Sequence, residues 1–332
     1  MANLYDVNGN VIITEPGTAT YTNPVITDEL AADPCVVYDN GLFYVFTTSD
    51  HVRMYSSPDL VEFTDYELIV TDTDYAILCE LTGNQTTHCW APNVVKIGDM
   101  WYMYVSVVAG NTAANCHMCV FTAPEAKGPW KYRGEITNAS SLGVNDCIDA
   151  DVVRDTDGKL YMFIGSSYGI YLIRLSSDGL SMDSSFTKVL IHPHSPSGSN
   201  DTRLEGSFCF WRNGYYYLFC SAGMYTKTGG YHLVISRCKS LQGPFLNKDG
   251  NSIVESANSG TTILSGNTAF YSPGHNSNII IDSNGDYWTV YHAYPSSETT
   301  RRLMIQKVLW DNNGWPYFEN GTPINGGIAP VF

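Results

Sequence analysis

Apolar and polar residues recur in one order five times along the chain. Each unit starts at a carboxylate or another polar or small residue, continues into a β-branched run, turns, and enters an aromatic-rich stretch. The turns carry the Asn, Asp and Gly residues that hairpins require. The pattern therefore predicts five β-hairpins: DPCVVYDNGLFYVF from Asp33, APNVVKIGDMWYMYV from Ala91, DADVVRDTDGKLYMF from Asp149, EGSFCFWRNGYYYLF from Glu205 and GHNSNIIIDSNGDYWTVY from Gly274.

The spacing of these units indicates the architecture. Their starts lie 58, 58, 56 and 69 residues apart, and each unit continues into a second pair of predicted strands. Helical periodicity does not extend over a useful length. A β-sandwich would not need this fivefold repeat, whereas a propeller does. We expect an all-β, five-bladed β-propeller with four antiparallel strands per blade, forming one domain over residues 1–332.

The composition narrows the classes of function. Aromatic residues make up 13% of the chain, which suits short strands and surfaces that stack on sugars. The net charge of −15 argues against nucleic acid, whose phosphates need Lys and Arg, and against an anionic membrane surface. We expect a neutral substrate and neither a nucleic-acid nor a membrane partner.

The start of the chain bears on location. MANLYDVNGN lacks the basic start and the apolar stretch of a signal peptide, and no run of about 18 apolar residues could span a membrane. Either the protein is intracellular or a leader has been removed. We expect an extracellular or periplasmic protein without its leader, and a cytoplasmic one is the alternative.

The cysteines do not form a recognisable metal motif. Nine Cys leave at least one unpaired, and Cys116 and Cys119 form a C-x-x-C. Residues three apart in a strand point to opposite faces, and no second C-x-x-C completes a zinc site. We therefore expect these cysteines to be buried as small apolar side chains.

Three acids indicate where chemistry occurs. Asp33, Asp149 and Glu205 occupy the same register of three repeats, so the first strands of three blades would bring them to one end of the central channel. Each alone would be an ordinary turn or strand-start residue, but three acids around one funnel repel one another. Acids outside this register, such as Asp151 and Asp155, are expected to be solvated or in turns.

Glycosidic cleavage requires such a set of acids. One carboxyl group gives a proton to the leaving oxygen and another activates water or attacks the sugar. A third acid nearby keeps the proton donor protonated and orients it. The sequence therefore predicts a glycoside hydrolase. The alternative from another class is a non-catalytic sugar-binding propeller, which would have lost one of the three acids.

With these residues in place, the chain resembles glycoside hydrolase family 43 from Asp33 to about Trp315. The resemblance rests on six motifs in the same order: Ala32-Asp33-Pro34, WAPN at 90–93, IDADVVRDTDGK from Ile148, LEGSFCFWRNGYYYLF from Leu204, SPGHNS from Ser272 and VYHAY from Val290. A WMNDPN-like stretch, typical of the invertase-like propellers that retain configuration, is absent.

The resemblance implies roles for individual residues. Asp33 would be the general base, Glu205 the general acid, and Asp149 the acid that tunes and orients Glu205. Members of the family invert configuration, which predicts carboxyl groups about 6.5–9.5 Å apart. His275 matches a channel histidine that binds substrate or lies beside Ca²⁺ or another ion held mostly by water, and a channel histidine without metal is the alternative.

Several other positions match sugar contacts in the family. Trp90 would pack against the sugar, with a place in the core as its alternative. Four residues beside the inner strand of blade three would contact sugar hydroxyls: Asn145, Ser166, Ser167 and Tyr168. Arg301 or Arg302 would reach the cleft from blade five. Neighbouring strand residues face opposite ways, so only one can do so, and we predict Arg302.

The motifs also indicate the substrate. SPGHNS, YHAY and the WDNNGWPYF ending are similar to arabinan-active members, so we expect hydrolysis of α-1,5-L-arabinofuranosyl linkages in plant cell-wall arabinan and its oligosaccharides. Endo-acting members typically carry His before the base, where this chain has Ala32, which favours exo action. The alternatives are an endo-arabinanase, a β-xylosidase or a debranching α-L-arabinofuranosidase. No cofactor is required for this chemistry.

Overall fold

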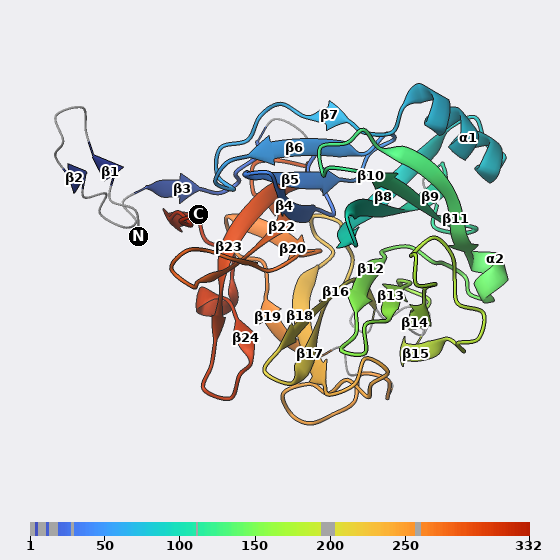
Figure 1. The fold of residues 1–332 in the computed structure, drawn as a ribbon. Helices are drawn as coiled ribbons and strands as arrows, with labels where there is room; N and C mark the ends of the chain where they lie inside the picture. Colours follow the sequence, from blue (N-terminus) through green and yellow to red (C-terminus); the bar gives the residue numbers. More distant parts are fainter. Residues whose placement is uncertain are drawn as a thin grey trace.

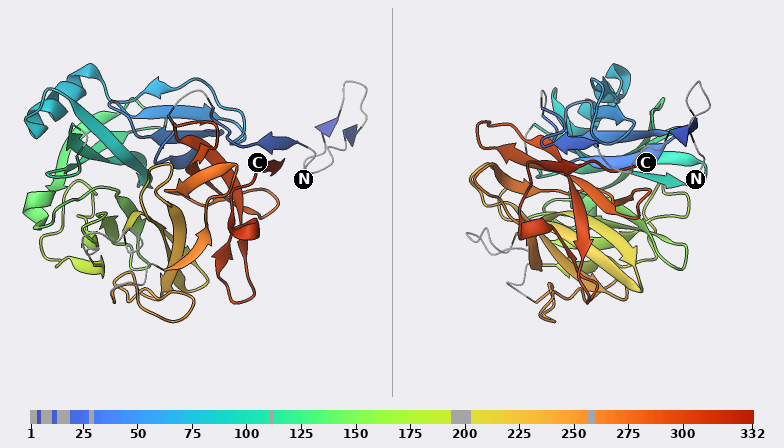
Figure 2. Two further views of the ribbon diagram at one scale, coloured as in Figure 1. Left: turned by 180° about the vertical axis from the view of Figure 1, so that it is seen from behind. Right: turned by 90° about the vertical axis from the view of Figure 1, so that its left-hand side faces the viewer.

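Five antiparallel sheets surround a common centre (Figures 1 and 2). The computed structural model describes residues 19–27, 30–110, 112–193, 203–255 and 260–332, together with the short strands β1 (Leu4–Tyr5) and β2 (Val11–Ile12). The predicted all-β, five-bladed propeller is confirmed; four blades have four strands each, and the fifth has one additional short strand.

The blades follow one another along the chain, and in the first four the strands lie in sequence order. Blade one holds β4 (Cys35–Asp39), β5 (Leu42–Thr47), β6 (Arg53–Ser57) and β7 (Glu67–Leu68). Blade two holds β8 (Thr87–Ile97), β9 (Met100–Ala109), β10 (His117–Ala123) and β11 (Lys131–Asn138). Blade three holds β12 (Asp151–Arg154), β13 (Leu160–Ile164), β14 (Ile170–Arg174) and β15 (Val189–His192).

Blades four and five complete the propeller. Blade four holds β16 (Leu204–Arg212), β17 (Tyr215–Ala222), β18 (His232–Cys238) and β19 (Thr261–Leu264). Blade five holds β20 (Phe270–Gly274), β22 (Tyr287–Pro295), β23 (Arg302–Trp310) and β24 (Pro316–Tyr317), and β21 (Ile280–Ile281) also pairs with β22.

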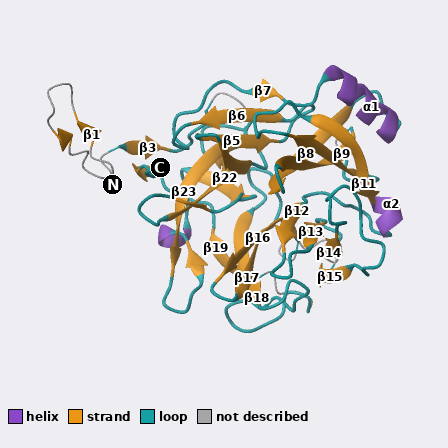
Figure 3. Ribbon diagram, in the orientation of Figure 1, coloured by secondary structure: helices purple, strands orange, loops and turns teal. Residues whose placement is uncertain are grey.

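The helices lie at the edge of the propeller (Figure 3). Helix α1 (Asp72–Thr82) was not expected from apolar periodicity, and it is specified by its ends. The Thr71 side chain caps the amide of Asp74, and Gly83 ends the helix in the left-handed conformation. Helix α2 (Ala139–Leu142) and the 3₁₀ turn η1 (Glu319–Gly321) are shorter. Within the described ranges, no helix has the length and apolar character needed to cross a membrane.

The core consists of five apolar clusters, one at each junction between neighbouring blades. Met103 and Phe121 of blade two, for example, pack with Phe46 of blade one. Cys119 lies in this cluster, whereas Cys116 lies in the cluster between blades two and three and contacts Cys147 there. The C-x-x-C residues therefore point to different sides of blade two.

The two ends of the chain close the circle at blade five. Strand β3 (Thr20–Thr22) pairs with β25 (Gly326–Ile328). The next residues run beside β23: the Asn23 side chain bonds the backbone of Ile305 in both directions, and the amide of Val25 bonds the carbonyl of Leu303 at 2.9 Å. These contacts join the segment before blade one to the last blade.

Each blade opens with a residue in the left-handed backbone conformation. In blades one, two, three and five these residues are Asp33, Ala91, Asp149 and His275, with φ between 43° and 58°. Blade four has Gly206 at this position, with φ 61°. Strand pairing agrees, since Phe208 pairs with Phe219 in the way that Cys35 pairs with Phe46. Glu205 therefore lies one residue before the predicted register.

The amide of each opening residue is held by the preceding blade. Thr48, Ser106 and Ser221 accept the amides of Ala91, Asp149 and His275 through their hydroxyls, and His292 Nδ1 accepts that of Asp33, at 2.7–3.1 Å. In blade three the corresponding residue is Gly165, where a Cβ would meet the Gly169 carbonyl at 2.1 Å. The Asp149 carboxylate takes its place and accepts the Gly206 amide at 3.0 Å.

Candidate active site

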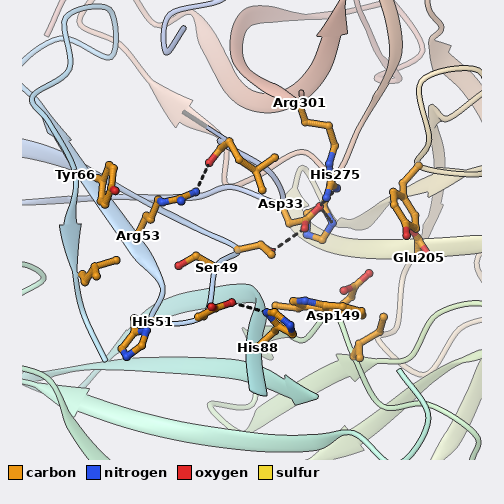
Figure 4. A pocket seen from close by; sticks show the side chains of 17 residues that line it. Asp33, Ser49, His51, Arg53, Tyr66, His88, Asp149, Glu205, His275 and Arg301 are labelled. Atoms are coloured by element: carbon orange, nitrogen blue, oxygen red, sulfur yellow. Dashed lines mark hydrogen bonds and ion pairs between the residues drawn. The ribbon is translucent and has the colours of Figure 1, made fainter. Parts of the chain in front are cut away.

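A cavity of about 720 Å³ contains all three predicted acids (Figure 4). A cavity of this size accommodates a small oligosaccharide. Asp33, Asp149 and Glu205 come from blades one, three and four and point into the same space; Asp33 and Asp149 occupy the left-handed openings of their blades, and Glu205 directly precedes that of blade four. Ten of its seventeen lining residues belong to blades one and two, among them His51, Tyr66, His88 and Trp90.

The Asp33 carboxylate accepts hydrogen bonds at both of its oxygens. Its Oδ1 accepts a hydrogen bond from Arg301 Nη1 at 2.9 Å, and its Oδ2 accepts one from the Thr48 hydroxyl at 2.7 Å. The Nδ1 atoms of His275 and His292 lie 3.5 and 3.3 Å from Oδ1. The Asp33 side chain is only 14% exposed, so these contacts are weakly screened.

These contacts determine the protonation of Asp33. Burial alone would raise the pKa of this carboxyl, but the charge of Arg301 and the Thr48 hydroxyl favour the charged form and hold the pKa well below its ordinary value. Burial also lowers the pKa of His275 and, more strongly, that of His292. Asp33 is therefore a carboxylate, and Arg301 supplies the permanent positive charge beside it.

Glu205 is held at both carboxyl oxygens. The Tyr231 hydroxyl donates to Oε1 at 2.8 Å, and the Ser166 hydroxyl donates to Oε2 at 2.7 Å. Ser166 is itself fixed, since its amide donates to Asp146 Oδ1 at 2.9 Å. Glu205 is paired in the sheet with Ser221, so its backbone is as well defined as its side chain.

Asp149 differs from Asp33 in that no cation lies among its contacts with the described residues. Burial raises its pKa well above the ordinary value, and the negative charges of Glu205 and Asp33 raise it further, while the Gly206 amide opposes the shift. Asp149 therefore retains a proton more readily than an isolated carboxyl would, and it does so beside Glu205. Such a pair can keep a proton available near neutral pH.

His275 lines the cavity, but its surroundings do not form a metal cage. Among the residues with described placement, no three or more His, Cys, Asp or Glu side chains converge as cation ligands. The nearest acid, Asp33, is already bound to Arg301. Ca²⁺ takes six to eight oxygen ligands, so the protein side chains here do not fit it by themselves. An ion held mostly by water near His275 stays a prediction.

The remaining predicted sugar contacts are placed differently from one another. Trp90 lines the cavity and also packs against the core between blades two and three. Ser166 reaches the site through Glu205. The other three predicted residues of blade three are not among the residues that line the cavity: Asn145, Ser167 and Tyr168.

The prediction of Arg302 as the cleft arginine was wrong. Arg302 bonds Glu298 through Nε at 2.5 Å, whereas Arg301 lines the cavity and binds Asp33. Strand β23 begins at Arg302, so Arg301 lies just before the strand. Face alternation within a strand therefore gave no basis for choosing between the two.

Three further residues were missed. Tyr231, just before β18, contacts the predicted acid Glu205. His292, in β22 and in the VYHAY motif, contacts the amide of the predicted base Asp33. Asp151 was expected to be solvated but is 4% exposed, because it accepts bonds from the Asn93 side chain and the Cys209 amide across three blades. Burial raises its pKa to about 7.

Comparisons with known proteins agree with this geometry. The chain is 28% identical to the extracellular exo-α-(1→5)-L-arabinofuranosidase ArbA of Cellvibrio japonicus, over 86% of each protein. It is 25% identical to the extracellular endo-α-(1→5)-L-arabinanase 2 of Bacillus subtilis, over 91% of this chain and 73% of the relative.

Solved structures and a family model give the same assignment. The α-L-arabinanase of Cellvibrio cellulosa superposes with a TM-score of 0.78 at 26% identity, covering 88% of this chain and 96% of that structure. The same enzyme complexed with arabinohexaose gives 0.77 at 25% identity, covering 89% and 96%. Residues 21–316 match the model for glycosyl hydrolases family 43. The chain is a glycoside hydrolase and belongs to glycosyl hydrolases family 43.

Proposed function

We propose that this protein hydrolyses α-1,5-L-arabinofuranosyl linkages of arabinan and arabino-oligosaccharides with inversion of configuration. The observation that carries the proposal is the convergence of Asp33, Asp149 and Glu205 on one cavity, with a cation beside Asp33 alone. Relatives named as exo- and endo-acting on α-1,5-arabinan support the substrate. Several relatives are named extracellular, which supports an extracellular enzyme.

Asp33 has the properties of the general base. Its carboxylate is kept ionised by Arg301 and is oriented by the Thr48 hydroxyl. A water molecule between Asp33 and the sugar would lose a proton to this carboxylate as its oxygen attacks the anomeric carbon. His275 and His292 are buried and neutral at pH 7, so they support Asp33 without competing for its role.

Glu205 has the position of the general acid. It lies in the same cavity on blade four, where it would transfer its proton to the leaving oxygen as the glycosidic bond breaks. The charge of Glu205 raises the pKa of Asp149, so the site that the two carboxyls share retains a proton, and Asp149 also holds the Gly206 amide next to Glu205. Asp149 therefore affects both the retention of a proton in the site and the backbone next to Glu205.

Exo action is the finer part of the proposal. The described lining residues lie mostly on blades one and two, which favours binding of the chain mainly on one side of the cleaved bond. Ala32, which is fully buried, stands where endo-acting relatives were expected to carry His. ArbA, which is 28% identical to the chain, is named as exo-acting, and a relative at 29% identity is named as endo-acting.

Product analysis on linear α-1,5-arabinan, followed over time by chromatography, tests the proposal. We expect one short product from the start, and proton NMR should show that the first arabinose released has the inverted, β configuration. A ladder of intermediate oligosaccharides would contradict exo action. Cleavage of xylo-oligosaccharides or arabinoxylan in place of arabinan would contradict the substrate.

A substitution in the acid tests the mechanism. Glu205→Gln should lower kcat on arabino-oligosaccharides by about 10³- to 10⁴-fold, because the leaving oxygen is no longer protonated. A substrate with an activated leaving group, 4-nitrophenyl α-L-arabinofuranoside, should lose much less. Unchanged turnover of oligosaccharides by this variant would overturn the assignment of Glu205.

A further inference from the structure

Tyr231 contacts the proposed acid from behind the cavity wall. Its hydroxyl lies 2.8 Å from Glu205 Oε1, yet Tyr231 is only 1% exposed and does not line the cavity. The hydroxyl therefore reaches the acid without facing the substrate. The residue directly precedes β18 of blade four, the blade that also carries Glu205.

The fold makes room for this ring at one glycine. A Cβ at Gly274 would lie 2.2 Å from both Cδ1 and Cε1 of Tyr231, a distance no side chain could occupy. Gly274 does not have a positive φ, so its lack of a side chain matters for the close approach of the ring. The glycine of the SPGHNS motif is thus explained by Tyr231.

A second contact, with His292, supports the Tyr231 ring. Tyr231 stacks on His292 with ring centroids 5.7 Å apart and planes within 4° of parallel. His292 Nδ1 accepts the Asp33 amide, so the hydrogen of this neutral imidazole is on Nε2. The stack therefore links Tyr231, which contacts Glu205, to His292, which holds the backbone of Asp33.

We propose that Tyr231 is a positioning residue for the general acid, with a hydroxyl that fixes the Glu205 carboxyl and stabilises the carboxylate formed when the proton leaves. The inference rests on the proposed function, in which Glu205 protonates the leaving oxygen. In that step the proton passes from Glu205 to the leaving oxygen, the glycosidic bond breaks, and Tyr231 keeps its own proton. A hydrogen bond to a forming charge is stronger than one to a neutral carboxyl, so the contact favours the transition state.

The test is Tyr231→Phe, which removes only the hydroxyl. We expect kcat on arabino-oligosaccharides to fall by about 10- to 100-fold with KM changed by less than about threefold. Turnover of 4-nitrophenyl α-L-arabinofuranoside should fall by less than about threefold, because its leaving group needs little protonation. The alkaline limb of the pH profile should move to higher pH, since the ionised form of Glu205 loses a donor.

A matched variant controls for the loss of a buried hydroxyl. Tyr104 is equally buried, and its hydroxyl bonds the Gly179 carbonyl at 2.8 Å away from the cavity, so Tyr104→Phe should leave both substrates and the pH profile unchanged. If Tyr231→Phe fails to fold, Ser166→Ala, which removes the hydroxyl donor to the other Glu205 oxygen, should show the same dependence on the leaving group.

Two results would overturn the inference. One is an equal fall in turnover of both substrates by Tyr231→Phe, and the other is no fall on oligosaccharides. Failure of the proposed function would look different, because Glu205→Gln would then keep its activity on oligosaccharides. The two variants measured side by side therefore separate the positioning role from the assignment of the acid.

Discussion

Asp33 and Asp149 open blades one and three at the same backbone position, yet their surroundings are opposite. Both have left-handed φ values, of 53° and 58°, and both have their amide held by the preceding blade. Asp33 contacts Arg301 and Thr48, whereas Asp149 accepts the Gly206 amide and faces the charge of Glu205. Their pKa values are accordingly shifted in opposite directions.

The difference shows that the repeat supplies position and the partners supply chemistry. A carboxyl at the start of a blade is directed to the channel whichever blade it belongs to. Whether it then stays ionised depends on one cation, Arg301, which reaches the blade-one acid. The side of the cavity with the cation favours a base, and the side with two neighbouring acids retains a proton.

Removing the two carboxylates should have unequal effects on catalysis. Asp33→Asn should lower kcat by about 10³- to 10⁴-fold on all substrates, including 4-nitrophenyl α-L-arabinofuranoside, because water activation is needed whatever the leaving group. Asp149→Asn should cost about 100-fold, because the site beside Glu205 loses the carboxyl that retains a proton there. Equal losses in rate-against-pH profiles would contradict the comparison.

Removing the cation should make Asp33 behave more like Asp149. In Arg301→Gln the positive charge that opposes the effect of burial is gone, so the pKa of Asp33 rises. Asp33 is then protonated at low pH and cannot accept a proton from water, so activity there is lost. We expect the acid limb of kcat/KM to move to higher pH, with a loss of about 100-fold near pH 5. Arg302→Gln, which removes the pair with Glu298, is the control and should leave the limb in place.

The smallest effects concern stability, and they should have opposite signs. Asp33→Asn leaves Arg301 buried without its charged partner and should lower the free energy of unfolding at pH 7 by about 3 kcal/mol. Asp149→Asn removes a carboxyl that is costly to ionise and should raise it by about 1 kcal/mol.

Denaturant unfolding at two pH values checks these signs. A raised folded pKa means that Asp149 costs stability as pH rises above about 3.9, so the gain from Asp149→Asn should disappear near pH 4. The depressed pKa of Asp33 means that its contribution is present above about 3.9 and is lost only at lower pH. A gain from Asp149→Asn that persists at pH 4 would contradict the electrostatic explanation.

The repeats allowed the fold and the three acids to be predicted, because strand alternation and turn residues are local signals. Asp33 and Asp149 follow the register, but Glu205 does not, since the left-handed position of blade four is taken by Gly206. Helix α1 was missed because its apolar face is weak. Its cap at Thr71 and its end at Gly83 are the signals that could have revealed it.

The parts of the site that sequence did not reveal are contacts between residues far apart along the chain. Tyr231 meets Glu205 within blade four, and Asp151 of blade three meets Cys209 of blade four. No local pattern distinguishes such residues from ordinary core tyrosines or turn acids. The alternation of side chains between the two faces of a strand could not place Arg301, because this residue precedes β23.

The closure of the propeller has a consequence for limited proteolysis. The segment that closes the circle bonds β23 through Asn23 and Val25, and the amide of Ala31 bonds the carbonyl of Arg301 at 3.2 Å, two residues before Asp33. A cut in this segment would detach both the base and its cation from the supports that align them. Nicked protein is therefore expected to lose activity while the other blades are still folded.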